Sequence, residues 1–446
     1  MSNTQIPGPR RGRDAMGVGL AILHRLARLR AIDHLGLRKP AERVVFEATK
    51  TGFRTLGAAN RTFRAVQKRT QPARLPAAPS TAWFDLTPTE DQQMLVDVMR
   101  EFSAEQLRPA AAAAEQAAKP PTELLEKSSE LGLALVGVPE EWGGAGDERS
   151  AITNVLAAEA LGHGDMGLAV ACLAPAAVST ALTLWGDETQ QATYLPAFVG
   201  ETAPAAALSI LEPQPLFDPF QLRTTARRTA DGFTLDGVKS LVPRAADAEL
   251  FVIAADLEDH GPALFLVESS TSGLTVEAEP AMGLRAASMG RVVLDNVKLP
   301  ASALLGEHTP RAYADCVDLS RLGWCGLAVG AGQAVLDYVI PYVNERQAFG
   351  EPISHRQSVA FMVADIGIEV DGMRLVTYRA ASRASQGKSF ARETALARRL
   401  CAERGMAVGN NGVQLLGGHG FVKDHPVERW YRDLRAISVM EGGLLV

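Results

Sequence analysis

Apolar residues follow two different periods along the chain. From Glu90 to about Gly200 they recur with the spacing of amphipathic and buried helices. From Thr202 the period falls to two, in short runs separated by glycine and charged residues, which predicts strands. Helical spacing returns at Ala312. The pattern predicts an α+β protein, mostly α, in the order helical, β, helical, with domains at 81–201, 202–308 and 309–446 behind an extension at 1–80.

The predicted elements can be placed more closely. Thr87, Pro88 and Glu90 have the pattern of a helix start, with Thr87 at the cap and Pro88 in the first turn. Predicted strands are 233–237, 250–253, 263–267, 274–276 and 292–294. Boundaries of the last helices are predicted near Pro341, Gly350 and Gly387.

One stretch, residues 166–186, contains no charged residue and has the length of a membrane span. It includes Pro175 and several serine and threonine residues, and it is rich in alanine rather than leucine. Buried helices of a helical domain explain this composition better than membrane insertion.

The first 80 residues are strongly basic. They carry 16 Lys/Arg and 4 Asp/Glu, a charge of +12, so the rest carries -6 - 12 = -18. Two amphipathic basic patterns lie in this extension, with apolar positions at Val18, Ile22, Leu26 and Leu29 and at Phe46, Phe53, Leu56 and Phe63. Three interpretations remain open: peripheral membrane contact through residues 15–70, packing on the body, and a mitochondrial-type targeting segment. Residues 71–79 have the composition of a linker.

Composition narrows the class of protein. Hydrophobic content of 47% and charged content of 22% are ordinary for a globular protein. The 4 cysteines are scattered and the 8 histidines do not cluster with them, so we expect no disulfide framework and no metal site. The body does not combine aromatic and basic stripes, so nucleic acid is not an expected partner. We expect a cytoplasmic protein, with the inner membrane surface as the place of any peripheral contact.

The final stretch of the chain carries the candidate chemistry. Gly417, Gly418 and Gly420 let the backbone turn sharply and approach another group closely. Glu441 stands in an apolar, glycine-flanked setting, where a partly desolvated carboxylate could act as a base. The ordinary alternatives are a turn for the glycines and a helix end for the glutamate.

Three ordered motifs resemble the acyl-CoA dehydrogenase family over about residues 84–443. They are 414–421 with 427–433 and 440–443, then 345–353 with Gln357, then 283–285 with 293–300. The resemblance implies a helical domain, a middle β-domain and a C-terminal four-helix bundle. It also implies FAD, bound between domains and across a subunit interface, and α,β-desaturation of an acyl-CoA thioester. In this chemistry a glutamate takes the α-proton while a hydride leaves Cβ for flavin N5.

The resemblance assigns roles to particular residues. Glu441 matches the catalytic base, and the alternative position before Arg321 holds Ser320, which cannot serve. Arg321 matches a substrate-binding position, although a helix-surface arginine is an equal alternative. Positions that hold the ADP half of FAD from the neighbouring subunit are matched by Arg346, Phe349, Gln357, Gln414, Gly417 and Gly418.

The sequence departs from the family where the middle domain faces the flavin ring. Leu211 and Phe217 replace the expected Thr and Ser, and 241–243 reads Leu-Val-Pro where the family has Trp-x-Thr. Side-chain donors and a stacking indole are therefore missing. Two functions follow: an active dehydrogenase that passes electrons to an electron-transfer flavoprotein or similar acceptor, or a non-catalytic or half-catalytic subunit of a hetero-oligomer. Either implies assembly, as a homo- or hetero-oligomer.

Overall fold

The computed structural model describes residues 87–134, 138–144, 150–200, 202–307, 309 and 311–444. The predicted amphipathic basic segments, the membrane contact through residues 15–70 and the linker at 71–79 lie outside the described residues.

The N-terminal part is helical. Its elements are α4 (Glu90–Phe102), a π-helical turn (Ser103–Leu107), α5 (Arg108–Ala117), α6 (Thr122–Glu130), α7 (Ala151–Gly162), α8 (Met166–Trp185) and α9 (Glu188–Phe198). The prediction of the first cap was wrong by two residues. Thr89, not Thr87, caps α4: its side chain accepts from the backbone N–H of Gln92, and the Gln92 side chain bonds back to Thr89 N. The capping box is completed by Gln92 rather than by Glu90.

Helix α8 corresponds to the uncharged stretch and is a core helix, as predicted. Two described helices, α8 and α10 (Ala312–Glu345), are long and apolar enough to cross a membrane by length and composition. In both, most of the apolar window is buried inside the protein, 72% in α8 and 61% in α10. This burial explains their composition, since a helix that is apolar on all sides packs in a core.

The middle part is a mostly antiparallel sheet. Its strands are β1 (Ala206–Ser209), β2 (Thr225–Arg228), β3 (Gly232–Val242), β4 (Leu250–Leu257), β5 (Gly261–Glu268), β6 (Leu274–Ala278), β7 (Gly290–Pro300) and β8 (Leu304–Leu305). The order is β6-β7-β3-β2-β4-β5-β8, and β1 and β2 each pair with β4 in parallel. All five predicted strands are confirmed, whereas β1, β2 and β8 are too short to show alternation in the sequence.

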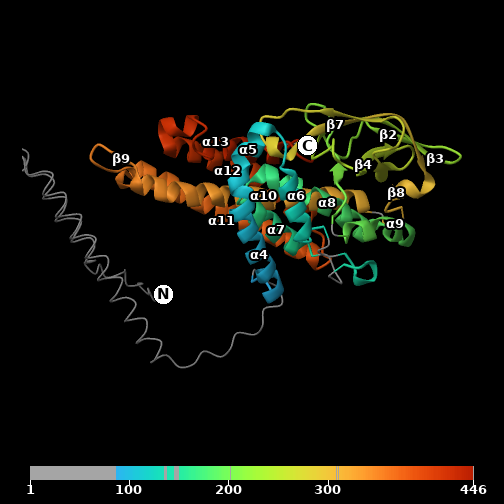
Figure 1. The fold of residues 1–446 in the computed structure, drawn as a ribbon, viewed down its shortest axis with the longest axis horizontal. Coiled ribbons are helices and arrows are strands. Elements are labelled where there is room, and N and C mark those ends of the chain that lie inside the picture. Colours follow the sequence, from blue (N-terminus) through green and yellow to red (C-terminus); the bar gives the residue numbers. More distant parts are fainter. Residues whose placement is uncertain are drawn as a thin grey trace, which may run out of the picture. The chain divides into compact units, whose positions relative to one another are not determined.

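The C-terminal part consists of long helices. They are α10, α11 (Gln357–Ser385), α12 (Ala391–Leu416) and the short α13 (Val427–Leu434), with a small hairpin of β9 (Gln347–Ala348) and β10 (Glu351–Pro352) between α10 and α11. Helices α10 to α12 extend away from the sheet (Figure 1). The connections contain Gly350 and Gly387, as predicted. The boundary near Pro341 was wrong, because α10 continues to Glu345. Pro341 has no N–H to donate to the carbonyl of Asp337 one turn earlier. Both residues are exposed, so water can form the missing hydrogen bond to that carbonyl.

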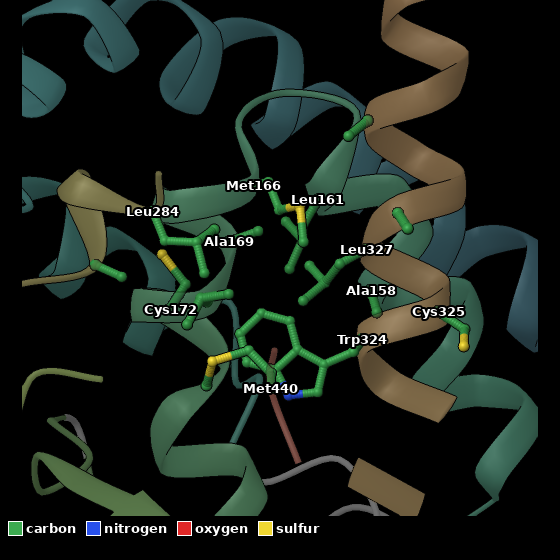
Figure 2. Packing of buried hydrophobic residues seen from close by; sticks show 14 of the residues in the cluster. Ala158, Leu161, Met166, Ala169, Cys172, Leu284, Trp324, Cys325, Leu327 and Met440 are labelled. Carbon is green, nitrogen blue, oxygen red and sulfur yellow. The ribbon is translucent and has the colours of Figure 1, made fainter. Parts of the chain in front are cut away.

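One large apolar cluster joins the three parts. It includes residues of α7, α8, the sheet, α10 and the chain end, among them Leu161, Leu168, Val252, Leu327 and Met440. Figure 2 shows Trp324 of α10 turned toward Cys172 of α8 and Met440, while Cys325 points to the other side of its helix. The candidate site lies within this cluster.

Candidate active site

A cavity of about 200 Å³ lies where the three parts meet. Its walls come from α4, α7, α8 and α10, from the residues around β1 and β3, and from the chain end. Many of the helical wall residues are alanine, which leaves room between closely packed helices. Among the described residues, Glu441 is the one charged side chain that lines the cavity.

Close helix packing sets the position of the α10 wall. A Cβ at Gly326 would lie 2.9 Å from the carbonyl oxygen of Val155, and one at Gly330 would lie 2.1 Å from that of Glu159. The two glycines therefore let α10 approach the backbone of α7 more closely than any other residue would allow. Ser320 and Trp324, one turn apart, are on the α10 face that reaches the cavity.

Glu441 is held by one of its two carboxylate oxygens. Glu441 is only 6% exposed. Ser320 Oγ donates to Oε1 at 2.8 Å, and Trp324 Nε1 donates to the same oxygen at 3.2 Å. No described residue donates a hydrogen bond to Oε2. This oxygen is not one of the fully buried polar atoms without a partner, so part of its surface is accessible. The carboxylate is thus oriented through Oε1 and accessible through Oε2.

The backbone around Glu441 is held in an unusual conformation. Glu441 has φ 56° and Gly442 has φ 113°, so two successive residues occupy the region that favours glycine. A Cβ at Gly442 would lie 2.8 Å from Pro219 Cδ. A non-glycine residue held at positive φ costs stability and persists only where its surroundings fix it.

Two arginines and one backbone group fix this segment. Arg321 donates from Nε and Nη2 to the carbonyl oxygen of Glu441 at 3.1 and 2.9 Å. Arg398 donates to the carbonyl oxygens of Met440, Gly442 and Gly443, and burial lowers the pKa of its guanidinium to about 10. The N–H of Gly443 donates to the Phe217 carbonyl at 2.7 Å. Substrate binding by Arg321 stays a prediction; the observed contact is to the segment that carries Glu441.

The wall facing the sheet is apolar. Leu211, Leu241 and Pro243, three positions where the sequence departs from the family pattern, all line the cavity with Glu441. Nearby donors are already used: Ser240 Oγ and Leu241 N bond the two oxygens of Glu279 at 2.9 and 2.7 Å. The fourth departure, Phe217, does not line the cavity and instead holds the chain end.

A buried ion pair supports this wall. The side chains of Lys239 and Glu212 are 0% and 2% exposed, and Lys239 Nζ lies 2.8 Å from Glu212 Oε1. Lys239 also donates to the carbonyl of Ile210, while Glu212 accepts from the backbone N–H groups of Arg223 and Thr224. Desolvation lowers the pKa of Lys239 to about 8, against the opposing effect of Glu212.

The other predicted site residues form a separate, exposed group. Arg346, Phe349 and Gln357 lie around the hairpin after α10, and Gln414, Gly417 and Gly418 lie at the end of α12; all six are exposed. Tyr342 links the two sets, since its hydroxyl reaches the Leu416 carbonyl at 3.4 Å and His419 Nδ1 at 2.9 Å. Arg346 is 25 residues from Arg321, or about 37 Å along a helix. The structure brings these six residues to one end of α10 and Glu441 to the other.

Several residues of the site were not predicted. Trp324, Arg398, Lys239 and Glu279 had no assigned role, and Ser320 was considered only as a base. The spacing of Ser320 and Trp324 was a usable signal, because residues four apart share a helix face. Arg398 and Glu279 gave no signal, since their partners are distant in sequence.

Comparison with known proteins agrees with this architecture. The descriptions "Acyl-CoA dehydrogenase, N-terminal domain", "middle domain" and "C-terminal domain" match residues 89–202, 207–297 and 311–444. The mitochondrial short-chain specific acyl-CoA dehydrogenase of Rattus norvegicus is 32% identical over 360 residues, 79% of this chain and 87% of that protein.

Solved structures show the same fold. Butyryl-CoA dehydrogenase from Megasphaera elsdenii has a TM-score of 0.75 at 28% identity, covering 81% of this chain and 97% of its own. PigA with FAD and proline has a TM-score of 0.74 at 26% identity, covering 81% and 96%. The three matched domains, in order, and the identity over most of both chains show that this chain belongs to the acyl-CoA dehydrogenase family of FAD-dependent oxidoreductases.

Proposed function

We propose that this chain desaturates an acyl-CoA thioester at the α,β position, with Glu441 as the base that takes the α-proton. The observation that carries the proposal is the carboxylate of Glu441, which is the one charged side chain on the described lining of an apolar cavity. A base in such a place is shielded from bulk water, so its carboxylate can meet the substrate without competing solvent.

The surroundings of Glu441 suit this role. Ser320 and Trp324 bind Oε1 and leave Oε2 for the substrate. Arg321 and Arg398 act on the backbone, not on the carboxylate, so the base stays oriented without direct ion pairing at its oxygens. Proton transfer requires the base to lie within hydrogen-bond reach of the α-carbon proton, and a fixed carboxylate limits the orientations that must be searched.

The exposed group at Arg346 and the apolar cavity wall differ in what they can offer to FAD. The exposed group at Arg346 offers a guanidinium, two amides and open glycines, a donor set suited to a pyrophosphate. The apolar wall of Leu211, Leu241 and Pro243 can pack against a ring but offers it no side-chain hydrogen bond. When bound, FAD supplies the acceptor for the hydride, and the chain supplies the base and the dry cavity.

The test is Glu441→Gln, which keeps the shape and the contacts to Ser320 and Trp324 but cannot accept a proton. We expect native folding and flavin content, with acyl-CoA-dependent flavin bleaching slowed by at least about 10²-fold. Glu403→Gln, on the exposed face of α12, is the matched control and should bleach normally. Near-normal bleaching in Glu441→Gln would remove Glu441 from the mechanism.

A second candidate is the non-catalytic or half-catalytic subunit that supplies the ADP-binding half to a related partner. It is favoured by one observation: Pro243 has no N–H to offer, and the donors of Ser240 and Leu241 are already used by Glu279. An absorbance spectrum of the purified chain separates the two, since an active enzyme shows flavin bands and the second candidate acquires them only with its partner.

Further partners follow from the proposed reaction. The reduced flavin requires an electron acceptor, for which we propose an electron-transfer flavoprotein or a similar protein. We also propose assembly as a homo- or hetero-oligomer through the exposed group at Arg346, Phe349 and Gln414. Cytoplasmic location, with peripheral contact at the inner membrane surface, stays a prediction.

A further inference from the structure

Trp324 occupies an unusual place beside the candidate base. It lies on α10, is 8% exposed, and lines the cavity. Its Nε1 donates to Glu441 Oε1 at 3.2 Å, so the indole ring stands directly next to the carboxylate. In Figure 2 the ring extends from α10 toward Cys172 of α8 and Met440.

Several residues that line the cavity with Trp324 are small, alongside the larger Leu327 and Met440. Ala157 and Ala158 on α7, Ala174 on α8 and Gly323 on α10 all line the same cavity. These residues take little space, so the bulk of the indole decides how much room remains beside the base. The second tryptophan of the lining, Trp185, is at the far end of α8.

The lining also restricts the chemistry of the ligand. Among the described residues it contains no cationic side chain, and its charged group is the base itself. Most of its polar side chains are engaged: Ser320 with Glu441, Ser240 with Glu279 and Thr153 with Gln92. An acyl group carrying a second carboxylate would be desolvated here without a partner.

We propose that Trp324 determines the size of the acyl group, and that the substrate carries a short, neutral acyl chain. This inference rests on the proposed function. The ring excludes longer chains from the space beside Glu441, and its N–H positions the carboxylate through Oε1. Removing the ring and removing only the N–H should therefore have different effects.

The experiment compares Trp324→Ala with Trp324→Phe in the flavin-loaded protein. Calorimetry measures binding of 3-thiabutanoyl-CoA and 3-thiaoctanoyl-CoA, in which sulfur replaces the β-carbon so that no desaturation occurs. Trp324→Ala should raise the affinity for 3-thiaoctanoyl-CoA relative to 3-thiabutanoyl-CoA by at least about tenfold, because methylenes gain apolar room. Trp324→Phe should shift the preference less than Trp324→Ala does, since an aromatic ring, although a smaller one, still occupies this place.

Kinetics test the role of the N–H. With butyryl-CoA, Trp324→Phe should lower kcat by about tenfold and leave KM unchanged, because the hydrogen bond to the base is lost while a smaller aromatic ring remains. Trp430→Phe is the matched control: this buried tryptophan of α13 does not line the cavity, and its Nε1 has no partner. It should leave ligand preference and kcat unchanged.

The outcomes separate this inference from the proposed function. If the wild type binds both ligands equally, or Trp324→Ala leaves the preference unchanged, Trp324 does not set the acyl size. If neither ligand binds to any variant, the acyl-CoA function itself is wrong. Should Trp324→Ala fail to fold, Trp324→Leu, which keeps apolar contact but shortens the side chain, carries the same comparison.

Discussion

The two ends of α10 differ in how far their polar groups are satisfied. At the cavity end, Ser320, Arg321 and Trp324 all bond to Glu441. At the other end, the side chain of Arg346 has no hydrogen bond or ion pair to any described residue, and Gly417 and Gly418 have open space where a Cβ would be. One end is completed by the chain itself, and the other offers its donors outward.

This difference indicates what each end needs. A buried polar site that is fully satisfied is rigid and suits chemistry, because a catalytic group must be held in place before the substrate arrives. An exposed set of uncommitted donors suits a ligand that arrives from outside, such as a cofactor shared with a second subunit. We therefore expect mutations at the cavity end to change stability and rate, and mutations at the exposed end to change cofactor affinity alone.

The largest effect is expected beneath the cavity wall. Lys239→Met leaves the carboxylate of Glu212 buried without its cation, and removing one partner of such a pair costs about 3–5 kcal/mol. Urea unfolding at pH 7 measures this loss in the free energy of unfolding. The double variant with Glu212→Gln removes the uncompensated charge and should recover much of the loss. If Lys239→Met alone unfolds like the wild type, the pair does not support the wall.

The same pair gives the wild type a pH dependence of stability. Desolvation lowers the pKa of Lys239 to about 8, below its ordinary value of 10.5, so the folded chain releases this proton first. Between about pH 8 and 10.5 the unfolded chain holds more protons, and the free energy of unfolding should rise with pH. Burial opposes ionisation of Glu212, but Lys239 and two backbone donors lower its pKa; its contribution is present above the ordinary value of 4.5 and is lost as the pH falls through the lowered one. Both slopes should be absent from the double variant.

The next effect belongs to the exposed end. Arg346→Ala removes an exposed charged donor that forms no hydrogen bond or ion pair with a described side chain, so the melting temperature should stay unchanged. If this guanidinium holds the pyrophosphate, flavin affinity should fall by about 10–100-fold, the value of one charge-assisted hydrogen bond. Fluorescence titration with FAD measures the change, and Arg392→Ala, an exposed arginine of α12, is the matched control. Unchanged flavin occupancy in Arg346→Ala would separate this end from the cofactor.

The sequence predicted the features with a local pattern and missed those that depend on contacts between distant segments. The long helices and the five longer strands have strong periodicity and were predicted. Glu441 was proposed from its apolar, glycine-flanked setting and from its match to the family motif. The six exposed residues share short motifs, so they too could be proposed. The contacts of Arg398 with the chain end and of Glu279 with Ser240 and Leu241 join segments more than 35 residues apart, and nothing in the local pattern indicates such pairings. Trp324 was missed because an aromatic residue in an apolar helix has the pattern of ordinary core.

A smaller effect is expected from Ser320 at the cavity end, where a substitution can show whether this residue orients Glu441 or stabilises the fold. Ser320→Ala removes one of the two donors to Glu441 Oε1 but leaves Trp324 in place. We expect kcat to fall by about tenfold with an unchanged melting temperature, since one hydrogen bond to a charged group is lost at a half-buried position. Ser438→Ala, in an exposed turn, is the control. A loss of stability with normal kcat would show that Ser320 serves the fold rather than the base.

The smallest expected effect comes from adding hydrogen-bond donors to the cavity wall. Pro243→Thr adds a backbone N–H and a hydroxyl to the wall that now offers the ring only apolar contact. One neutral hydrogen bond contributes about 0.5–1.5 kcal/mol, so flavin affinity should rise by about 2–10-fold. Pro243→Val adds the N–H without the hydroxyl and shows which donor acts. Because the wall and Arg346 are far apart, the effects of Pro243→Thr and Arg346→Ala should add in the double variant. If Pro243→Thr leaves the affinity unchanged while Arg346→Ala lowers it, the flavin is held by the exposed end and the wall serves the substrate.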